Sequence, residues 1–139
     1  MSIGIFYDNI KYRLKKSRET IKIIEKVILR ESKIPGDLYF IITNDEALIK
    51  INREFLNRDT LTDVIAFDYS KGKTVNGEIY ISKETVKRNA YNYKISLEEE
   101  MIRVMIHGTL HLCGFNDKSS EEKKIMRKKE DEWILRVNN

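Results

Sequence analysis

Hydrophobic residues along this 139-residue chain recur at two spacings, one typical of helices and one typical of strands. The segment from about Arg18 to Glu31 carries branched apolar residues three or four positions apart, which favours an amphipathic helix. Leu38–Ile42 is instead a short apolar run that directly follows Pro35-Gly36, and it predicts a buried strand. In Gly77–Ser82 two isoleucines point to one side and a tyrosine to the other, as a half-buried strand requires.

Applied to the whole chain, the two spacings predict four strands and five helices. The predicted strands are Ile3–Tyr7, Leu38–Ile42, Val64–Tyr69 and Gly77–Ser82, with a polar loop at Asn57–Thr62. The predicted helices run from about Arg18 to Glu31, Asn44 to Phe55, Lys83 to Tyr93, Ser96 to Leu112 and Ser119 to Val137. This order indicates an α+β fold, with a single domain over residues 1–139 and one small mixed sheet packed by helices.

Local signals fix several helix ends. Asn44 is a favourable cap for the helix that follows it, with Leu48, Ile51 and Phe55 expected on one face. Ser96-Leu97-Glu98-Glu99 is a capping box, in which the serine hydroxyl accepts from the amide three residues later. Gly114 is expected to end that helix, because a helix commonly stops on a residue with left-handed backbone angles.

Composition narrows the class of protein. Hydrophobic residues make up 41% of the chain and charged residues 35%, which excludes a disordered or fibrous protein. No apolar run approaches the roughly 20 residues that span a bilayer, so no membrane partner is expected. Cys113 is the single cysteine, and the first residues lack a signal peptide pattern. We therefore expect a cytoplasmic protein.

The net charge of +4 is a modest surplus of basic residues, which is compatible with nucleic-acid binding without establishing it. Basic residues gather in Lys11–Arg18 and in Lys123–Lys129. Runs of this kind are more often solvated helix faces than binding surfaces, and that interpretation is favoured for both.

The two histidines of the chain, His107 and His111, lie four residues apart. On a helix this spacing places both imidazoles on one face, close enough to share a metal ion. Gly114 then lets the chain fold back, so that Asp117 can return a carboxylate to the same ion. A helical histidine pair can also be a satisfied core pair, but the glycine and the acid at these offsets favour a metal site.

The spacing is similar to the His-Glu-x-x-His-x-x-Gly-x-x-His signature of metzincin proteases. The glutamate that serves those enzymes as general base is replaced here by Gly108, which cannot move a proton. Peptide hydrolysis is therefore disfavoured. Cys113 lies two residues beyond His111, so on a helix it faces away from the histidines, and we expect it to pack in the core.

The segment from His107 to Asp117, HGTLHLCGFND, resembles the HGxLHLxGyDH signature of the YbeY family of metal-dependent endoribonucleases. Two further stretches are similar to the family. Asn52–Phe67 resembles its NxxYRxKDxPTDVLSF stretch, and Gly77–Ser82 its GDIxIS strand. The resemblance covers roughly residues 37–120.

The resemblance implies a zincin-like fold and one Zn²⁺ ion held by three residues of the signature. Carried onto this chain, the ligands are His107, His111 and Asp117, although the family usually has a third histidine where Asp117 stands. It also implies single-strand-selective RNA cleavage in rRNA maturation and ribosome quality control. The expected partners are an rRNA precursor and the small ribosomal subunit or its proteins, with no DNA.

Two further departures concern the residues around the ion. The family's catalytic arginine aligns with Leu56, and Asn116 replaces the acid before the last ligand. Arg58, at the family's lysine position, is then the candidate cation for a phosphate, with Arg53 as a weaker one. Asp63 is a weak candidate for a supporting role beside the site.

Other functions stay open at this stage. The chain can be a ribosome-assembly factor that binds RNA or protein and whose metal ion is mainly structural, which the loss of the usual arginine at Leu56 favours. Hydrolysis of another substrate, peptides included, is the third alternative, and Gly108 argues against it.

Overall fold

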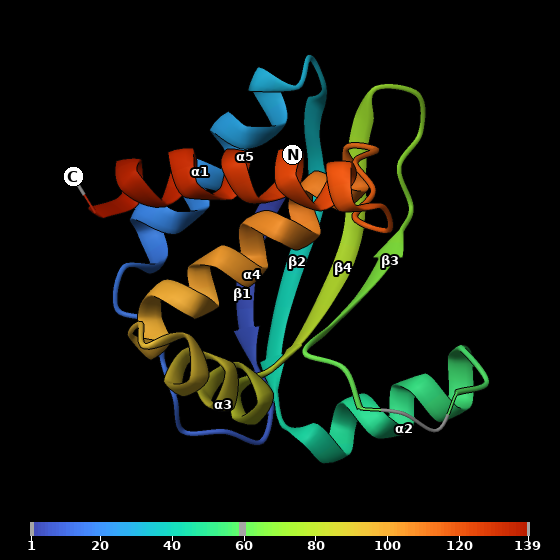
Figure 1. Ribbon diagram of the computed structural model, residues 1–139. Coiled ribbons are helices and arrows are strands. Elements are labelled where there is room, and N and C mark those ends of the chain that lie inside the picture. Colours follow the sequence, from blue (N-terminus) through green and yellow to red (C-terminus); the bar gives the residue numbers. More distant parts are fainter. Residues whose placement is uncertain (1, 59–60, 139) are drawn as a thin grey trace.

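A four-stranded mixed sheet forms one layer of the protein, whose computed structural model describes residues 2–58 and 61–138 (Figure 1). The strands are β1 (Ser2–Tyr7), β2 (Ile34–Thr43), β3 (Val64–Asp68) and β4 (Thr74–Ser82). Their order across the sheet is β1-β2-β4-β3. The pairs β1–β2 and β2–β4 are parallel and β3 is antiparallel to β4, so the sheet is mixed, as predicted.

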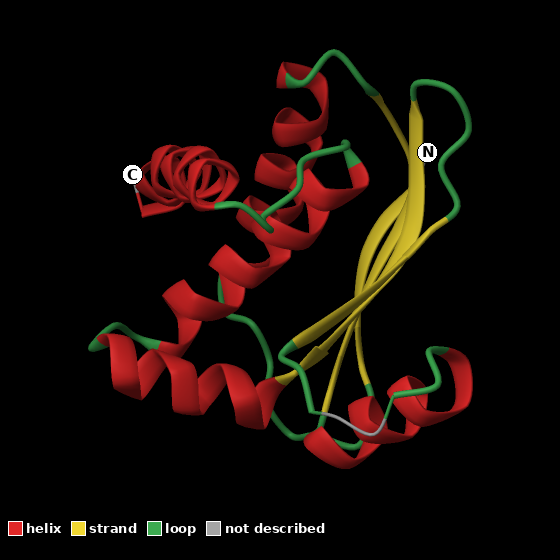
Figure 2. Cartoon of the chain, turned by 45° about the vertical axis from the view of Figure 1, so that its right-hand side comes forward, coloured by secondary structure: helices red, strands yellow, loops and turns green. Residues whose placement is uncertain are grey.

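Helices form the second layer. They are α1 (Ser17–Arg30), α2 (Asp45–Phe55), α3 (Lys83–Tyr93), α4 (Leu97–Leu112) and α5 (Ser120–Asn138). Figure 2 shows the sheet nearly edge-on, with α4 running beside it and α1, α3 and α5 gathered around α4 on the same side. α2 stands apart at one end of the sheet (Figure 1). The predicted α+β class and the predicted order of elements are both confirmed.

β2 begins four residues earlier than predicted, because Pro35-Gly36 lies inside the strand and does not precede it. A proline is tolerated there since β1 pairs with β2 only from Asp37 onward, which leaves this end of β2 at the edge of the sheet. The register with β4 shifts between Pro35 and Leu38. Gly36 permits the close approach, because a Cβ there would lie 2.7 Å from the Val75 carbonyl oxygen.

α2 is capped as predicted, with the Asn44 side chain accepting from the Ala47 amide. The expected apolar face is only partly confirmed. Leu48 is buried, but Phe55 is 68% exposed, because the C-terminal end of α2 extends past the end of the sheet (Figure 1). Asn52 occupies the buried position instead.

α4 is the helix on which the core is built, since 11 of its 16 residues are buried. Gly108 lies directly against β4, where a Cβ would approach the Ile79 side chain to 3.0 Å. Gly77 of β4 meets α4 in the same way, with a Cβ there 2.9 Å from the Leu112 side chain. These glycines let helix and sheet approach closely, which fixes the position of the residues on the other faces of α4.

Within the described ranges, no helix is both long enough and apolar enough to cross a membrane.

Candidate metal centre

The C-terminal end of α4 turns the chain back on itself. Gly114 adopts a φ of +105°, and its amide donates to the His111 carbonyl at 3.0 Å. The Phe115 amide donates to the Leu110 carbonyl at 3.1 Å, which completes the paired hydrogen bonds of a Schellman C-cap. The glycine at this point therefore ends the helix as predicted, and the reversal brings Asp117 back toward the histidines.

The structure brings His107, His111 and Asp117 together. The Nε2 atoms of the two histidines are 2.9 Å apart. One carboxylate oxygen of Asp117, Oδ2, lies 3.1 Å from the His107 Nε2 and 3.6 Å from that of His111. Each residue offers one ligand atom, all within 4.8 Å of one another, and the three are grouped closely enough to hold a metal ion.

The other ring nitrogen of each histidine is already engaged. The His111 Nδ1 lies 2.9 Å from the carbonyl oxygen of Phe115, which can only accept, so this nitrogen carries a proton. The His107 Nδ1 lies 2.6 Å from a Glu130 carboxylate oxygen. In these tautomers both Nε2 atoms are acceptors that face each other and a carboxylate, an arrangement that becomes favourable when a proton or a metal ion lies between them. The donor set therefore fits a metal ion.

The surroundings of His107 are electronegative. Burial lowers the pKa of this imidazole, but the hydrogen bond and charge of Glu130, joined by the charges of Asp117 and Asp63, outweigh it, and the pKa is raised above its usual value. The same carboxylates attract any cation at the Nε2 position.

Glu130 links α5 to α4 and was missed by sequence reasoning. It is 4% exposed, and its second carboxylate oxygen lies 3.3 Å from the guanidinium of Arg103, which also pairs with Asp131 at 2.8 Å. A usable signal was present, because Glu130 lies four residues after Met126 and three before Trp133, on the buried stripe of the helix. A charged residue on such a stripe requires a partner.

Three further residues that the sequence singled out lie near the site: Asp63, Cys113 and Gly108. Asp63, just before β3, lines the pocket beside His107, and burial raises its pKa, although the hydrogen bonds and the His107 charge oppose the rise. Cys113 is buried, and burial raises the pKa of its thiol to about 11, in agreement with a packing role. At Gly108 the contact with Ile79 leaves no space for the glutamate of a protease.

Arg58 and Arg53, the two candidate cations, lie at the C-terminal end of α2. Both side chains are exposed, Arg53 in the last turn of α2 and Arg58 just beyond it. Neither of them is among the residues that line the pocket beside His107.

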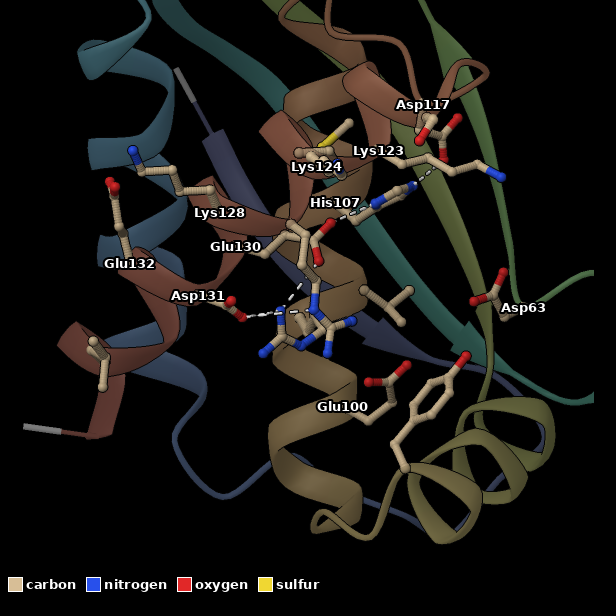
Figure 3. A pocket seen from close by; sticks show the side chains of 17 residues that line it. Asp63, Glu100, His107, Asp117, Lys123, Lys124, Lys128, Glu130, Asp131 and Glu132 are labelled. Atoms are coloured by element: carbon tan, nitrogen blue, oxygen red, sulfur yellow. Dashed lines mark hydrogen bonds and ion pairs between the residues drawn. The ribbon is translucent and has the colours of Figure 1, made fainter.

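A pocket of about 940 Å³ opens beside the cluster, between α4 and α5. Figure 3 shows His107 and Asp117 at one end and Glu100 at the other, with Asp63 to one side and Lys123 and Lys124 above. The histidines and Asp117 keep between 25% and 37% of their side-chain surface exposed. A site that is partly open to solvent leaves room for a substrate, unlike the closed sites of structural zinc.

Fold and site together define an α+β protein of the zincin-like type, with a candidate metal centre at the end of its central helix. A family model described as Endoribonuclease YbeY matches residues 6–138. The chain therefore belongs to the Endoribonuclease YbeY family.

Individual relatives agree with this assignment. Endoribonuclease YbeY of Flavobacterium psychrophilum is 47% identical over 129 residues, which cover 93% of this chain and 92% of the relative. The protein of the same name from Bacteroides fragilis is 40% identical, and the alignment covers 96% of both chains. The solution structure of TM1509 from Thermotoga maritima is similar with a TM-score of 0.67 at 28% identity, covering 98% of this chain and 89% of that one.

Replacing Glu130 tests its control of His107. We expect Glu130→Gln to weaken the binding of a divalent metal ion, with Zn²⁺ as the probe, by about 10- to 100-fold, because the neutral amide holds the His107 Nδ1 proton less firmly. Competition with a fluorescent chelator measures the affinity. Glu132→Gln is the matched control, since Glu132 is a half-exposed carboxylate of the same helix that pairs with Arg30. Equal zinc affinity for the two variants would contradict the role given to Glu130.

Proposed function

We propose that this protein is a metal-dependent endoribonuclease that cleaves single-stranded RNA in the cytoplasm, with one Zn²⁺ ion held by His107, His111 and Asp117. The observation that carries the proposal is the convergence of three acceptor atoms within 4.8 Å, at the mouth of a pocket. Membership of the family supports the reaction and the substrate, since the relatives are named endoribonucleases. Processing of an rRNA precursor on the small ribosomal subunit belongs to the same proposal and rests on the family resemblance.

A bound zinc ion supplies Lewis acidity, which polarises a phosphate oxygen and lowers the pKa of a water molecule. The protein's own residues prepare this chemistry. Glu130 and the Phe115 carbonyl hold the Nδ1 protons of the two histidines, so both Nε2 atoms stay available. Asp117 adds a negative charge that a third histidine would not, which lowers the net charge of the site and admits other divalent ions.

Three lysines are among the residues that line the pocket, and we expect them to contact the RNA backbone. Lys123, Lys124 and Lys128 all lie on the pocket side of α5. They form part of the basic run that the sequence alone favoured as a solvated face. Lys123 and Lys124 lie near the His107 end of the pocket (Figure 3), and this position supports phosphate binding instead.

Removing the ligands tests the proposal directly. We expect His111→Ala and Asp117→Asn to lose stoichiometric zinc, measured by mass spectrometry, and to lose at least about 100-fold in cleavage of a single-stranded RNA. Asp8→Asn is the matched control for Asp117→Asn, because Asp8 is an exposed carboxylate outside the pocket. We expect this variant to keep its zinc content and its cleavage activity. Unchanged zinc content and cleavage in the two site variants would show that the ion lies elsewhere.

Chelation separates a catalytic ion from a structural one, and thus separates the nuclease from an assembly factor with a structural metal site. The ligands are partly exposed and none of them belongs to the hydrophobic core, so we expect the zinc-free protein to keep its fold. Circular dichroism would stay native while RNA cleavage is abolished, and added Zn²⁺ would restore it. Loss of the native spectrum on chelation would favour the assembly factor.

Arg58 is proposed as the cation that offsets charge on the phosphate, at the place where the family has a lysine. If it contacts RNA, we expect Arg58→Ala to lower kcat/KM about tenfold and Arg58→Lys to recover most of the loss, because either cation can pair with a phosphate. Steady-state cleavage of a single-stranded RNA measures this. The same kcat/KM in Arg58→Ala and in the wild type would remove Arg58 from the site.

A further inference from the structure

The pocket beside the metal centre has a second polar group that the proposed chemistry does not use. Glu100 lies on α4 seven residues before His107, on the same face of the helix and at the opposite end of the pocket (Figure 3). Its side chain is 4% exposed, and its Oε1 atom is buried without a hydrogen-bond partner. A buried carboxyl oxygen in this state costs free energy unless a ligand pairs with it.

Neighbouring charges do not satisfy Glu100. Arg103 lies one turn further along α4, and its Nη1 pairs with Glu130 and Asp131. Its Nε atom is buried and, like the Glu100 Oε1, has no hydrogen-bond partner. Asp63 and Glu130 add negative charge, whereas Arg103 and Arg127 oppose it. Burial dominates and raises the pKa of Glu100 to about 7, so the carboxyl group is held in an unfavourable environment at neutral pH.

Glu100 is too far from the metal centre to act in bond cleavage. Seven residues of helix separate it from His107 by about 10 Å along the axis. A general base must come within about 3 Å of the proton that it removes. The separation instead suits the far end of a nucleotide whose phosphate lies near the ion.

The walls of the pocket match the two halves of a nucleotide. The wall formed by α5 carries the lysines Lys123, Lys124 and Lys128 together with three carboxylates, those of Glu130, Asp131 and Glu132. The inner surface is apolar, formed by Val104 and Met126, and the half-exposed ring of Tyr93 lies at the rim. Phosphate binds on cationic walls, and an unstacked base binds where apolar and aromatic groups surround a few polar atoms.

From these contacts we infer that the pocket holds one unstacked nucleotide of the RNA, with its phosphate beside the α5 lysines and an amino group of its base donating to Glu100. This inference rests on the proposed nuclease function and adds a base preference to it. Cytosine and uracil are the sharpest pair of bases for a test, because cytosine carries an amino donor where uracil carries a carbonyl acceptor. Glu100 is thus a specificity-determining residue and not a catalytic one.

The test uses the zinc-loaded full chain and single-stranded RNAs that carry cytosine, uracil or no base at one position, varied in turn along the strand. Fluorescence anisotropy measures the Kd of each RNA, and a parallel assay measures cleavage. We expect one position at which cytosine binds at least about fivefold more tightly than uracil or the abasic site. Glu100→Gln keeps the size of the side chain but adds a donor, so this preference should fall to less than about twofold.

Glu121→Gln is the matched control. It removes the same charge from an exposed carboxylate of α5 that does not line the pocket, and it should keep the preference for cytosine. Thermal melting and zinc content verify that both variants fold and load zinc.

Absence of base preference at every position, or an equal preference in wild type and Glu100→Gln, would overturn the inference. Binding with a Glu100-dependent preference but without cleavage would support the pocket assignment and refute the nuclease. Cleavage without such a preference would support the nuclease and refute the pocket assignment.

Discussion

The buried carboxylate of Glu130 is the interaction on which the arrangement of the site depends. A charge at 4% exposure is tolerated only when it is paired, and here it is shared between the Arg103 guanidinium and the His107 imidazole. Both partners lie on α4, whereas Glu130 lies on α5. The need to satisfy one buried charge thus ties the last helix to the central one, orients the first histidine and forms one wall of the pocket.

The close contact between α4 and the sheet is a second constraint on the position of the site. Gly108 lies against Ile79, and Gly77 lies against Leu112, so the helix cannot shift without a clash or a void. A neighbouring face of α4 carries Glu100, Arg103, His107 and His111. Rigid packing on one face of the helix therefore holds the polar groups of the neighbouring face in fixed positions, which a metal centre requires.

Much of the fold could be predicted because its signals are local. The apolar spacing identified every helix and strand in the correct order, and the caps at Asn44 and Ser96 begin helices where expected. The errors arose where a neighbouring strand or the end of the sheet decided the outcome. Pro35 lies inside β2 because β1 does not reach it, and Phe55 is exposed because α2 extends past the sheet.

The candidate site, like the fold, has some features that local sequence signals predict and others that they do not. The spacing of His107, His111, Gly114 and Asp117 was sufficient by itself to predict a cluster within eleven residues, because a helical turn and a glycine stop are local geometry. Only the tertiary structure decided that Glu130 orients His107, that Glu100 lies unpaired in the pocket, and that Arg58 lies outside it. Those relations join residues on different helices or depend on what surrounds a side chain, and burial and pairing are set by packing rather than by the order of residues along the chain.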